Sequence, residues 1–595
     1  MNKFSKLLLI VMLMCSVSML CSVYATNYYI GFTDVTSSNH YTATNANLIS
    51  VLSNANADDI VYIAKNCKFY LDSQLIVNTH IIGGCVPTGD GSQRTAIGAA
   101  GNLTDSMTVL DGNSLRHPLR SEKHRVATVN TNGIIENCLI RNGHARGTTN
   151  NNNDLNGHGG GVLLNGGKLY NCIIRGNVAM NVEHQSTTKS SGGGVYITND
   201  GGQVVNCVIV FNMDDKGVGI DGVSGESINN TVAYNTQTPT WVNIPGGTFQ
   251  PFTESPPDLT PNRYITLSDF YIASTECTTG QYACFMSAVE MFYTALYPPY
   301  LSYADRDSLV KAKAPVPVEY TGYPSGITVE QYAILAFGGG AYRGGSGTTI
   351  GGITDPGRYI WNILQSQTNV DYASLTAISS DLYARVWYPV YGGTAANTTS
   401  GEALRRDNYA MSYVSWWGSL AFSLWIGGCL PTEAQWEYAA RHDGSIASTS
   451  NKYAGCNTDS TLANYAWYSD NASSRVHEVA KKLPTAKGLY DMSGNLWEWI
   501  LDPYTSSYTA NVAGSTTLAA GSNLLSSGSG TGASESPYLN PVAYPAGQQR
   551  VLRGGSWNGS ATDCSLGYRS SGTPSIFQYG SSRTSGIGFR AVCVP

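Results

Sequence analysis

The block GLYDMSGNLWEW, at residues 488–499, carries more information about architecture than any other part of this chain. Its glycines and acidic residues are typical of a tight turn lined by oxygen atoms. Three other blocks accompany it in chain order: IPGGTF at 244–249, LPTEAQWEYAAR at 430–441, and RGGSW at 553–557 with GFR at 588–590. The block at 430–441 predicts an amphipathic helix in which Trp436, Ala439 and Ala440 share one face. Thr432 can cap its N-terminus, and the Gln435 side chain can hydrogen-bond back to Thr432.

In this order, the four blocks resemble the formylglycine-generating enzyme family, also called sulfatase-modifying factor proteins. The resemblance implies an α+β domain with a variant of the C-type lectin fold over residues 244–595, after a linker at 237–243. A Gly- and Tyr-rich insertion at about 315–408 interrupts the pattern. The chain of 595 residues is too long for one core, so a multidomain protein is expected.

The resemblance also implies what chemistry to expect. The family's oxidising enzymes need two cysteines, five residues apart after the RGGS motif, because paired thiolates hold the copper ion that activates oxygen. Here those positions are Gly559 and Cys564. We therefore expect no copper and no catalytic residue, and Cys564 becomes a packed thiol or a disulfide partner of Cys593. Oxidation of cysteine to formylglycine, with Cys564 as its catalytic residue, is the alternative.

A calcium site is a further implication of the family pattern. Asp491 and Glu498 would supply carboxylates, and Gly494 and Leu496 would supply carbonyl oxygens. A second site would involve Asn464, Tyr465 and Asn471. The alternative is a turn whose acidic residues only cap backbone or form ion pairs.

Residues 558–586 are rich in Ser, Gly, Thr and Tyr, with isolated apolar side chains. Antibody paratopes share this composition, in which aromatic residues supply contact area and small polar residues adapt their hydrogen bonds. A flexible surface loop is the alternative, but it would not need an exposed Phe or Ile. The stretch therefore predicts a surface for a carbohydrate or protein ligand, with contacts from Gly559, Ser560, Asp563, Tyr568, Ser570, Ser571, Ile576, Phe577, Tyr579, Ser581, Ser582 and Thr584.

The arrangement also resembles the variable proteins of diversity-generating retroelements, where a lectin-like domain ends in RGGSW, a diversified stretch and GFR. Randomised adenines in Asn codons cannot produce Lys, Glu, Gln, Met or Trp. Between residues 558 and 586 only Gln578 belongs to that set. Diversification of this segment is therefore a hypothesis from composition and framing motifs.

The N-terminal half contains an internal repeat. The copies NCLIR, NCIIR and NCVIV begin at Asn137, Asn171 and Asn206, and glycine-led β-forming runs lie between them. Short repeated strands must stack to bury their apolar faces, so Cys138, Cys172 and Cys207 are expected to form an inward ladder. The pattern resembles the right-handed parallel β-helix, or pectin-lyase-like, fold, which gives an all-β domain at residues 26–236.

A stalk or glycan-facing scaffold is the favoured role for this half, but polysaccharide cleavage is an alternative. A lyase would need clustered carboxylates and a basic residue on one face. The local candidates are Asp214, Asp215 and Asp221 with Lys216 or His158, and their spacing is equally typical of solvated loop residues.

The N-terminus predicts a signal peptide at residues 1–25, with lysines, a short apolar run and small residues before the cleavage point. The protein is therefore expected to be secreted or on the cell surface, with no transmembrane segment after the signal. A net charge of −6 argues against a nucleic-acid partner. The mature chain keeps an odd number of cysteines and has no C-x-x-C pair, which argues against a structural zinc site.

Overall fold

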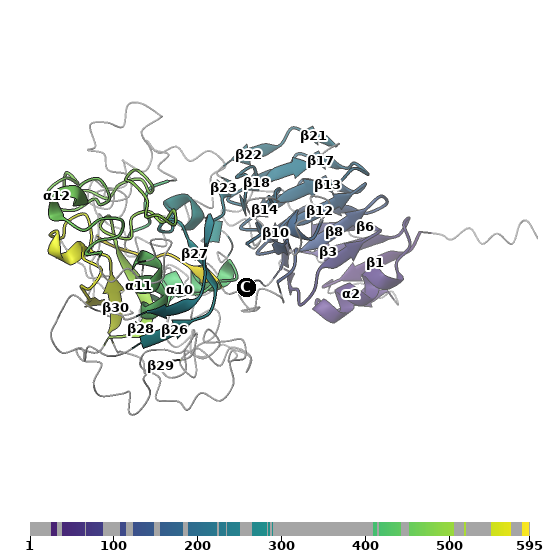
Figure 1. Cartoon of the computed structure of the whole chain (residues 1–595). Coiled ribbons are helices and arrows are strands. Elements are labelled where there is room, and N and C mark those ends of the chain that lie inside the picture. The colour runs from purple at the N-terminus through teal and green to yellow at the C-terminus, as the bar shows by residue number, and fades with distance from the viewer. Residues whose placement is uncertain are drawn as a thin grey trace, which may run out of the picture.

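The computed structural model describes residues 25–32, 39–65, 67–86, 107–112, 114, 123–147, 155–182, 189–222, 225–233, 235–249, 264–282, 284–285, 288, 408–412, 414, 416–441, 451–504, 517–518, 549–572 and 586–593. Two bodies lie side by side in Figure 1. Strands β1 to β23 form the first, which we call the parallel stack. Strands β24 to β33 and helices α10 to α12 form the second, which we call the head. Almost all of the predicted insertion at 315–408 lies outside the described residues.

The parallel stack consists of four sheets in which the paired neighbouring strands all run parallel. The first sheet has the order β2 (His40–Tyr41), β1 (Asn27–Ile30), β3 (Ile60–Ala64), β6 (His80–Cys85), β9 (Ile134–Glu136), β13 (Lys168–Tyr170), β17 (Gln203–Val205) and β21 (Glu226–Ile228). The second has β22 (Thr231–Ala233), β18 (Val208–Val210), β14 (Ile173–Arg175), β10 (Cys138–Arg141), β7 (Thr108–Asp111) and β4 (Lys68–Tyr70). The third has β11 (His144–Arg146), β15 (Val178–Met180), β19 (Met213–Asp214) and β23 (Thr236–Gln237). The fourth has β20 (Ile220–Gly222), β16 (Val195–Ile197), β12 (Val162–Asn165), β8 (Ala127–Asn130) and β5 (Leu75–Val77).

The repeated asparagines explain how the chain turns between these sheets. Asn137, Asn171, Asn206 and Asn229 each adopt a left-handed conformation, with φ between 52° and 57°, just before strands of the second sheet. Asparagine tolerates this conformation better than most residues, because its short side chain can hydrogen-bond locally. Each copy of the repeat therefore makes the same corner, and the copies stack in register.

The predicted cysteine ladder is confirmed. Register pairs join Leu139 to Ile173 and Ile173 to Val208, so Cys138, Cys172 and Cys207 occupy successive rungs. All three are buried, and the Cys172 N–H donates to Cys207 Sγ at 3.4 Å. A second ladder consists of asparagine amides, in which Asn177 Nδ2 donates to Asn212 Oδ1 at 3.0 Å and Asn212 Nδ2 donates to Asn235 Oδ1 at 3.1 Å. Both ladders lock the rungs in one register.

One end of the stack is capped by helix α2 (Asn45–Asn54), which packs on β1 and β5. Thr44 caps the helix by accepting a hydrogen bond from the Asn47 N–H. Leu48, Val51 and Leu52 are buried in the same apolar core as the inward side chains of the stack. A short 3₁₀ turn, η4 (Leu155–Gly157), lies beside β11.

The described part of the head contains three small sheets and three helices with defined bounds, besides helical residues within 279–288. Its first sheet has the order β24 (Trp241–Ile244), β27 (Phe270–Ala273) and β33 (Val592–Cys593), so the two ends of the domain pair with each other. The second has β25 (Gly247–Phe249), β26 (Tyr264–Leu267) and β29 (Thr517–Leu518). The third has β31 (Ser570–Gly572), β30 (Arg550–Arg553), β28 (Trp497–Pro503) and β32 (Ile587–Gly588). The helices are α10 (Trp416–Trp425), α11 (Glu433–Arg441) and α12 (Asp459–Leu462), with a 3₁₀ turn η9 (Thr562–Cys564).

The predicted helix in the block at 430–441 is confirmed as α11, with one difference. Thr432 caps it as expected: its Oγ1 accepts from the Gln435 N–H at 3.2 Å, and Gln435 Oε1 accepts from the Thr432 N–H at 3.0 Å. The helix, however, is buried on every side, including Glu433, Glu437 and Arg441. The sequence predicted only an amphipathic helix, and the acidic side chains of its polar face meet arginines from other parts of the head.

The head contacts the side of the stack through the C-terminal end of α10. The Trp425 indole N–H donates to Asn142 Oδ1 at 3.1 Å, and the Ser114 hydroxyl donates to the Trp425 carbonyl at 3.2 Å. The Trp241 indole N–H contacts Met180 Sδ at 3.3 Å. Outward residues of the stack, among them Val109, Leu139 and Ile173, belong to the same apolar cluster as the core of the head. Stack and head therefore share a packed interface.

The eleven cysteines of residues 67–593 are all free thiols. The disulfide between Cys564 and Cys593 that the sequence left open is absent, because the two side chains lie in separate surroundings. Cys564 packs with Tyr453, Leu462 and Tyr468, whereas Cys593 Sγ contacts the Gly427 carbonyl at 3.6 Å. Within the described part of the chain, no helix combines the length and the apolar character needed to cross a membrane.

Candidate functional site

The turn at residues 488–499 places Asp491 in the interior of the head. Asp491 and Asn495 have positive φ of 57° and 59°, and Gly494 lies between them at 83°. Asp491 is 2% exposed. Its Oδ2 accepts from the Ala480 N–H at 2.8 Å, but its Oδ1 is buried with no hydrogen-bond partner. Burial raises the pKa of Asp491 to about 6. The turn thus presents one carboxylate oxygen that no described residue satisfies.

A second buried acid, Glu276, lies against the same turn and was missed by sequence reasoning. Its Oε1 accepts from the Leu496 N–H at 2.9 Å, and its Oε2 accepts from Asn495 Nδ2 at 2.6 Å. Burial, followed by the charges of Asp491 and Glu498, raises the pKa of Glu276 well above its usual range. In the sequence, Glu276 is followed by Cys277 and Thr278, and this local context gives no indication of a carboxylate cluster.

Glu498, the other predicted carboxylate ligand, is held by a buried arginine. Arg590 Nε and Nη2 donate to Glu498 Oε1 at 2.9 and 2.7 Å, and the Trp436 indole N–H donates to Oε2 at 2.8 Å. Burial opposes the charge of Arg590, but Glu498 in particular raises its pKa. The GFR motif at 588–590 is therefore tied to the WEW motif at 497–499 through one ion pair. Asp491, Glu276 and Glu498 then share a single buried guanidinium.

The second predicted calcium set occupies turns that are already hydrogen-bonded. The Asn464 carbonyl accepts from the Leu483 N–H at 2.9 Å. Asn471 Oδ1 accepts from the Tyr468 N–H, and its Nδ2 donates to the Ala466 carbonyl, both at 2.9 Å. The ring of Tyr465 packs against Gly455. The oxygen and the nitrogen of the Asn471 side-chain amide are thus both used within one local turn, and this set stays a prediction.

Within the predicted ligand segment, Gly559, Ser560 and Asp563 form one compact turn. Asp563 Oδ2 accepts from the Ser560 N–H at 2.8 Å and from the Ser560 hydroxyl at 3.1 Å. The Gly559 carbonyl accepts from the Ser469 N–H at 2.9 Å, which ties the turn to the loop after α12. The turn leads into η9, so the polar side chains lie at the surface while Cys564 turns inward.

Cys564 is inaccessible, and position 559 does not face it closely. Cys564 has no exposed surface, and burial raises its pKa well above the usual range. A Cβ atom added at Gly559 would first meet Asp563 Oδ2, at 3.0 Å, then Asp563 Cβ and the Ser556 carbonyl. A buried thiol with a raised pKa is a poor source of the thiolate that copper binding requires.

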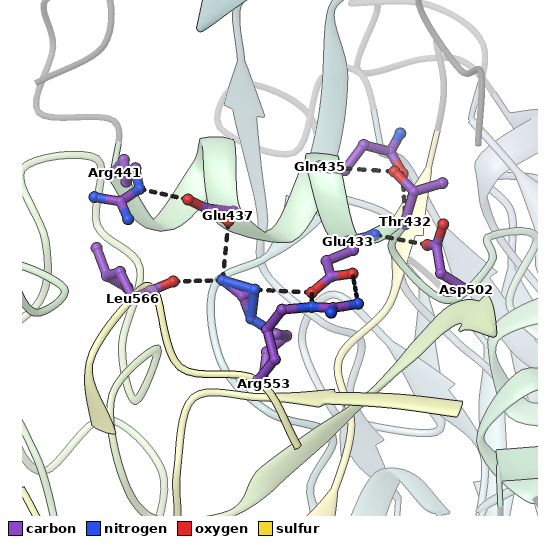
Figure 2. A network of polar contacts seen from close by, with 9 residues as sticks. Thr432, Glu433, Gln435, Glu437, Arg441, Asp502, Arg553 and Leu566 are labelled. Atoms are coloured by element: carbon purple, nitrogen blue, oxygen red, sulfur yellow. Dashed lines mark hydrogen bonds and ion pairs between the residues drawn. The ribbon is translucent and has the colours of Figure 1, made fainter. Parts of the chain in front are cut away.

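The acidic side chains of helix α11 hold this segment through ion pairs with arginines, and Figure 2 shows the contacts of Arg553. Arg553 Nη1 donates to Glu433 Oε1 and its Nη2 to Glu437 Oε2, each at 3.0 Å, and Nη2 also donates to the Leu566 carbonyl. Arg569 donates to both Glu433 oxygens, at 2.6 and 2.9 Å. Arg569 is thus a framework residue inside the predicted segment, which composition alone could not reveal.

A third acidic residue, Asp502, accepts a hydrogen bond from the backbone at the N-terminus of helix α11. Asp502 Oδ2 accepts from the Glu433 N–H at 2.7 Å, while its Oδ1 is buried with no hydrogen-bond partner (Figure 2). Burial, followed by the charge of Glu433, raises the pKa of Asp502 to about 7. A carboxyl at this position responds to pH in the neutral range.

Tyr568 is the most exposed aromatic residue of the described segment, at 38%. Its ring lies 5.9 Å from that of Trp497, which sequence reasoning did not include. Ser570 and Ser571 pair with Leu552 and Val551 in the antiparallel β30–β31 ladder, and the Ser571 hydroxyl donates to Gln549 Oε1 at 2.8 Å. The other predicted contacts lie outside the described residues, namely Ile576, Phe577, Tyr579, Ser581, Ser582 and Thr584.

The acidic candidates of the stack serve its turns. Asp214 is buried, and its two oxygens accept from the backbone N–H groups of Gly193, Lys216, Gly217, Val218 and Gly219. Asp215 accepts from the N–H groups of Asn181 and Ser190, and burial raises its pKa to about 6. Asp221 and Lys216 form a surface ion pair at 2.6 Å. His158 stacks on Tyr196, and burial lowers its pKa. These contacts support the structural interpretation of the acids over a cleavage site.

Comparisons with known proteins agree with the motifs of the head. A family model described as the sulfatase-modifying factor enzyme 1-like domain matches residues 228–594. The formylglycine-generating enzyme of Streptomyces coelicolor is 30% identical to this chain over 199 residues. These residues cover 31% of this chain and 52% of that enzyme. The Bos taurus enzyme is 27% identical over 219 residues, or 34% and 50% of the two chains. This chain thus spans about half the length of those curated relatives.

Other similar proteins carry different descriptions. A Bos taurus protein described as inactive C-alpha-formylglycine-generating enzyme 2 is 32% identical over 111 residues, covering 18% of this chain and 36% of that protein. Among solved structures, Treponema denticola variable protein 1 is similar at 21% identity and a TM-score of 0.30, covering 60% of this chain and 95% of its own. The extent of the family match decides the assignment: this chain belongs to the family of proteins with a sulfatase-modifying factor enzyme 1-like domain.

Proposed function

We propose that this protein is exported to the cell surface or beyond it, where its head binds a carbohydrate or protein ligand without oxidising cysteine. The observation that carries the proposal is at the two copper positions. One is Gly559, and the other is the fully buried Cys564. A single buried thiol cannot supply two soft ligands to one copper ion. Oxidation of cysteine to formylglycine, which the family match accommodates equally well, is the competing function.

The ligand surface that we propose comprises the turn at 559–563, Tyr568, and the start of β31. Its support is geometric. Helix α11 holds Arg553 and Arg569 by buried ion pairs, so the backbone beneath the segment is fixed. Tyr568 remains exposed above it, next to Trp497. Rigid aromatic residues beside short polar ones are typical of surfaces that bind a ligand with little loss of conformational entropy.

The parallel stack is proposed to be a right-handed parallel β-helix of the pectin-lyase-like kind, acting as a scaffold. The four parallel sheets and the cysteine and asparagine ladders support it. Connections between parallel strands are right-handed in nearly all proteins, which favours that hand. The use of Asp214 and Asp215 in turns supports a scaffold over a lyase.

A calcium ion is proposed at the turn of residues 491–498. Asp491 fits this role, because its Oδ1 is buried and has no hydrogen-bond partner. Glu498 fits less well, because its oxygens already accept from Arg590 and Trp436. The carbonyls of Gly494 and Leu496 would complete the set with Asp491. Bound calcium would supply the positive charge that one guanidinium does not give to three buried acids.

Diversification of residues 558–586 is proposed as the source of ligand variety. The turn at 559–563 and the exposed Tyr568 lie on the head surface, whereas Cys564, Leu566 and Arg569 are structural. Sequencing this segment in many copies of the gene should show changes concentrated at the exposed positions. Changes spread evenly along the head would contradict this proposal.

Binding is tested by screening the full-length protein on immobilised glycans with calcium present and on bacterial surface proteins. Tyr568→Ala should weaken binding at least tenfold. The matched control is Leu483→Ala, since Leu483 is the most exposed large apolar residue of the head, at 53%, and lies outside the segment. Binding that is insensitive to Tyr568 and to substitutions at 559–571 would contradict the proposed surface.

A further inference from the structure

The repeat of the stack places two arginines on neighbouring strands. Its first two copies, NCLIR and NCIIR, end at Arg141 on β10 and Arg175 on β14, whereas the third copy ends at Val210 on β18. Register pairs join Arg141 to Arg175 and Arg175 to Val210. Neighbouring strands lie about 4.8 Å apart, and like charges directly opposite one another destabilise a sheet. Two stacked arginines therefore require a compensating charge.

Both arginines are buried on the side of the stack that the head covers. Leu139 and Ile173, two residues earlier on the same strands, belong to the apolar cluster that includes the core of the head. Alternate residues of a strand share one face, so the arginines lie on this face too. Figure 1 shows β10 and β14 on the side of the stack toward the head. Arg141 has no exposed surface and Arg175 is 3% exposed, so bulk water does not solvate their charges.

The contacts of Arg141 leave most of its guanidinium group unsatisfied. Its Nε donates to Asp111 Oδ2 at 3.0 Å, and Asp111 Oδ1 accepts from Asn142 Nδ2 at 2.9 Å. Nη1 and Nη2 of Arg141 are buried and have no hydrogen-bond partner among the described residues. These two nitrogens carry four of the five N–H donors of the group. Buried donors without an acceptor are costly, and an arginine cannot lose its charge to avoid that cost.

The second arginine adds to the positive charge at this place. Burial, followed by the charge of Arg141, lowers the pKa of Arg175 to about 9. Arg175 therefore still carries its proton at neutral pH. The ion pair with Asp111 balances one of the two positive charges. A further negative charge beside Nη1 and Nη2 of Arg141 would balance the other and accept the unused hydrogen bonds.

We infer that Arg141 and Arg175 form a buried binding site for one small oxyanion of the phosphate or sulfate class, held between stack and head. The planar fork of an arginine matches the oxygen atoms of such an anion, which would accept from Nη1 and Nη2 of Arg141. Its charge would also offset the repulsion between the two guanidinium groups. The site does not involve the proposed ligand surface at 559–571, so it is independent of the ligand that the head binds.

Release of the anion on unfolding tests the inference. Full-length protein is prepared in sulfate or phosphate, dialysed into chloride at the same ionic strength and unfolded in urea, and the released anions are measured by ion chromatography. The wild type should release one equivalent of oxyanion per chain. Arg141→Lys keeps a cation for Asp111 but replaces the fork with a single ammonium group, and it should release far less. Arg475→Lys is the matched control, because Arg475 is exposed on the head, and it should behave as the wild type does.

Thermal unfolding gives a second measurement for an anion that exchanges during dialysis. Sulfate or phosphate should then raise the Tm of the wild type in a saturable way, because an anion that binds only the folded state stabilises it. Arg175→Met leaves the ion pair between Arg141 and Asp111 in place and should reduce this rise, and circular dichroism shows whether the variant folds. A wild type that releases no oxyanion and gains no more from sulfate or phosphate than from chloride would overturn the inference. Folded Arg141→Lys and Arg175→Met variants that release and respond as the wild type does would also overturn it.

Discussion

Asp491 is the residue at which charge and burial are least balanced. Its Oδ1 is buried without a hydrogen-bond partner among the described residues. The charges of Asp491 and Glu498 both raise the pKa of the neighbouring Glu276. A cation near this oxygen removes the cost of the unsatisfied atom and the repulsion among the acids together.

Calcium is therefore predicted to stabilise the head through Asp491. Adding calcium to chelator-treated protein should raise its Tm by several degrees, and Asp491→Asn should remove most of that rise. Asparagine is a suitable replacement because it tolerates the positive φ of this position. Asp459→Asn is the control, since Asp459 is a surface acid paired with Lys452. An equal calcium response in both variants would place the ion elsewhere.

Asp502 predicts a pH dependence of stability. Its pKa in the folded protein is raised to about 7, above the value of about 4 for an unfolded aspartate. The folded state therefore binds this proton more tightly, so its contribution to stability is complete below about pH 4 and is lost as the pH rises through about 7. Each pKa unit corresponds to about 1.4 kcal/mol.

The measurement is the free energy of unfolding in urea between pH 4 and pH 8, for wild type and Asp502→Asn. The wild type should lose stability relative to the variant as the pH rises, because asparagine keeps the acceptor for the Glu433 N–H but does not ionise. Asp215 and Glu276 also have raised pKa values, and they contribute equally to both proteins. Parallel curves for the two proteins would contradict the prediction.

At the scale of elements, helix α10 carries the junction between head and stack. Trp425 ends this helix, and its indole N–H donates to Asn142 at a corner of the stack. Trp425→Phe keeps most of the packing but removes this donor, which should cost about 1 kcal/mol. Trp416→Phe is matched to it, because the Trp416 indole N–H donates to the Ile500 carbonyl inside the head.

Calorimetry distinguishes the two substitutions. The wild type should unfold in one transition, because stack and head are coupled. Trp425→Phe should split this transition into separate stack and head transitions more than Trp416→Phe does. Two well-separated transitions in the wild type would show that the shared apolar cluster does not couple the two parts.

Individual elements also show how far sequence reasoning reaches. The helix cap at Thr432 and the cysteine ladder depend on spacing within a few residues or on a fixed repeat, and both were predicted correctly. The burial of Glu433 and Glu437 depends on arginines more than 100 residues away in the chain, so helical periodicity gave no indication of it. Glu276 was missed for the same reason, since its partners Asn495 and Leu496 lie about 220 residues away. Local signals were sufficient for local structure, and the charged interior required the fold.

At the scale of the whole molecule, the eleven cysteines of the described residues are free, and ten of them are buried. This is unusual for a protein that we expect to enter an oxidising compartment. Burial protects these thiols, because reaction with oxidants requires an accessible thiolate. Ellman's reagent should therefore modify at most Cys456 in the native protein and all eleven thiols after unfolding in guanidinium. Rapid modification of several thiols under native conditions would contradict the described packing.

The proposed division of labour between stack and head depends on the absence of cysteine oxidation that we propose for the head. Its framework, from Asp491 to Arg590, matches the family, whereas the copper position at 559 holds glycine. The most direct test is incubation of the purified protein with copper(I), oxygen and a cysteine-containing sulfatase peptide, followed by mass spectrometry of the peptide. The account predicts no conversion of cysteine to formylglycine, for wild type and for Cys564→Ser alike. Conversion by the wild type that Cys564→Ser abolishes would show that the head is an oxidase and would contradict the account.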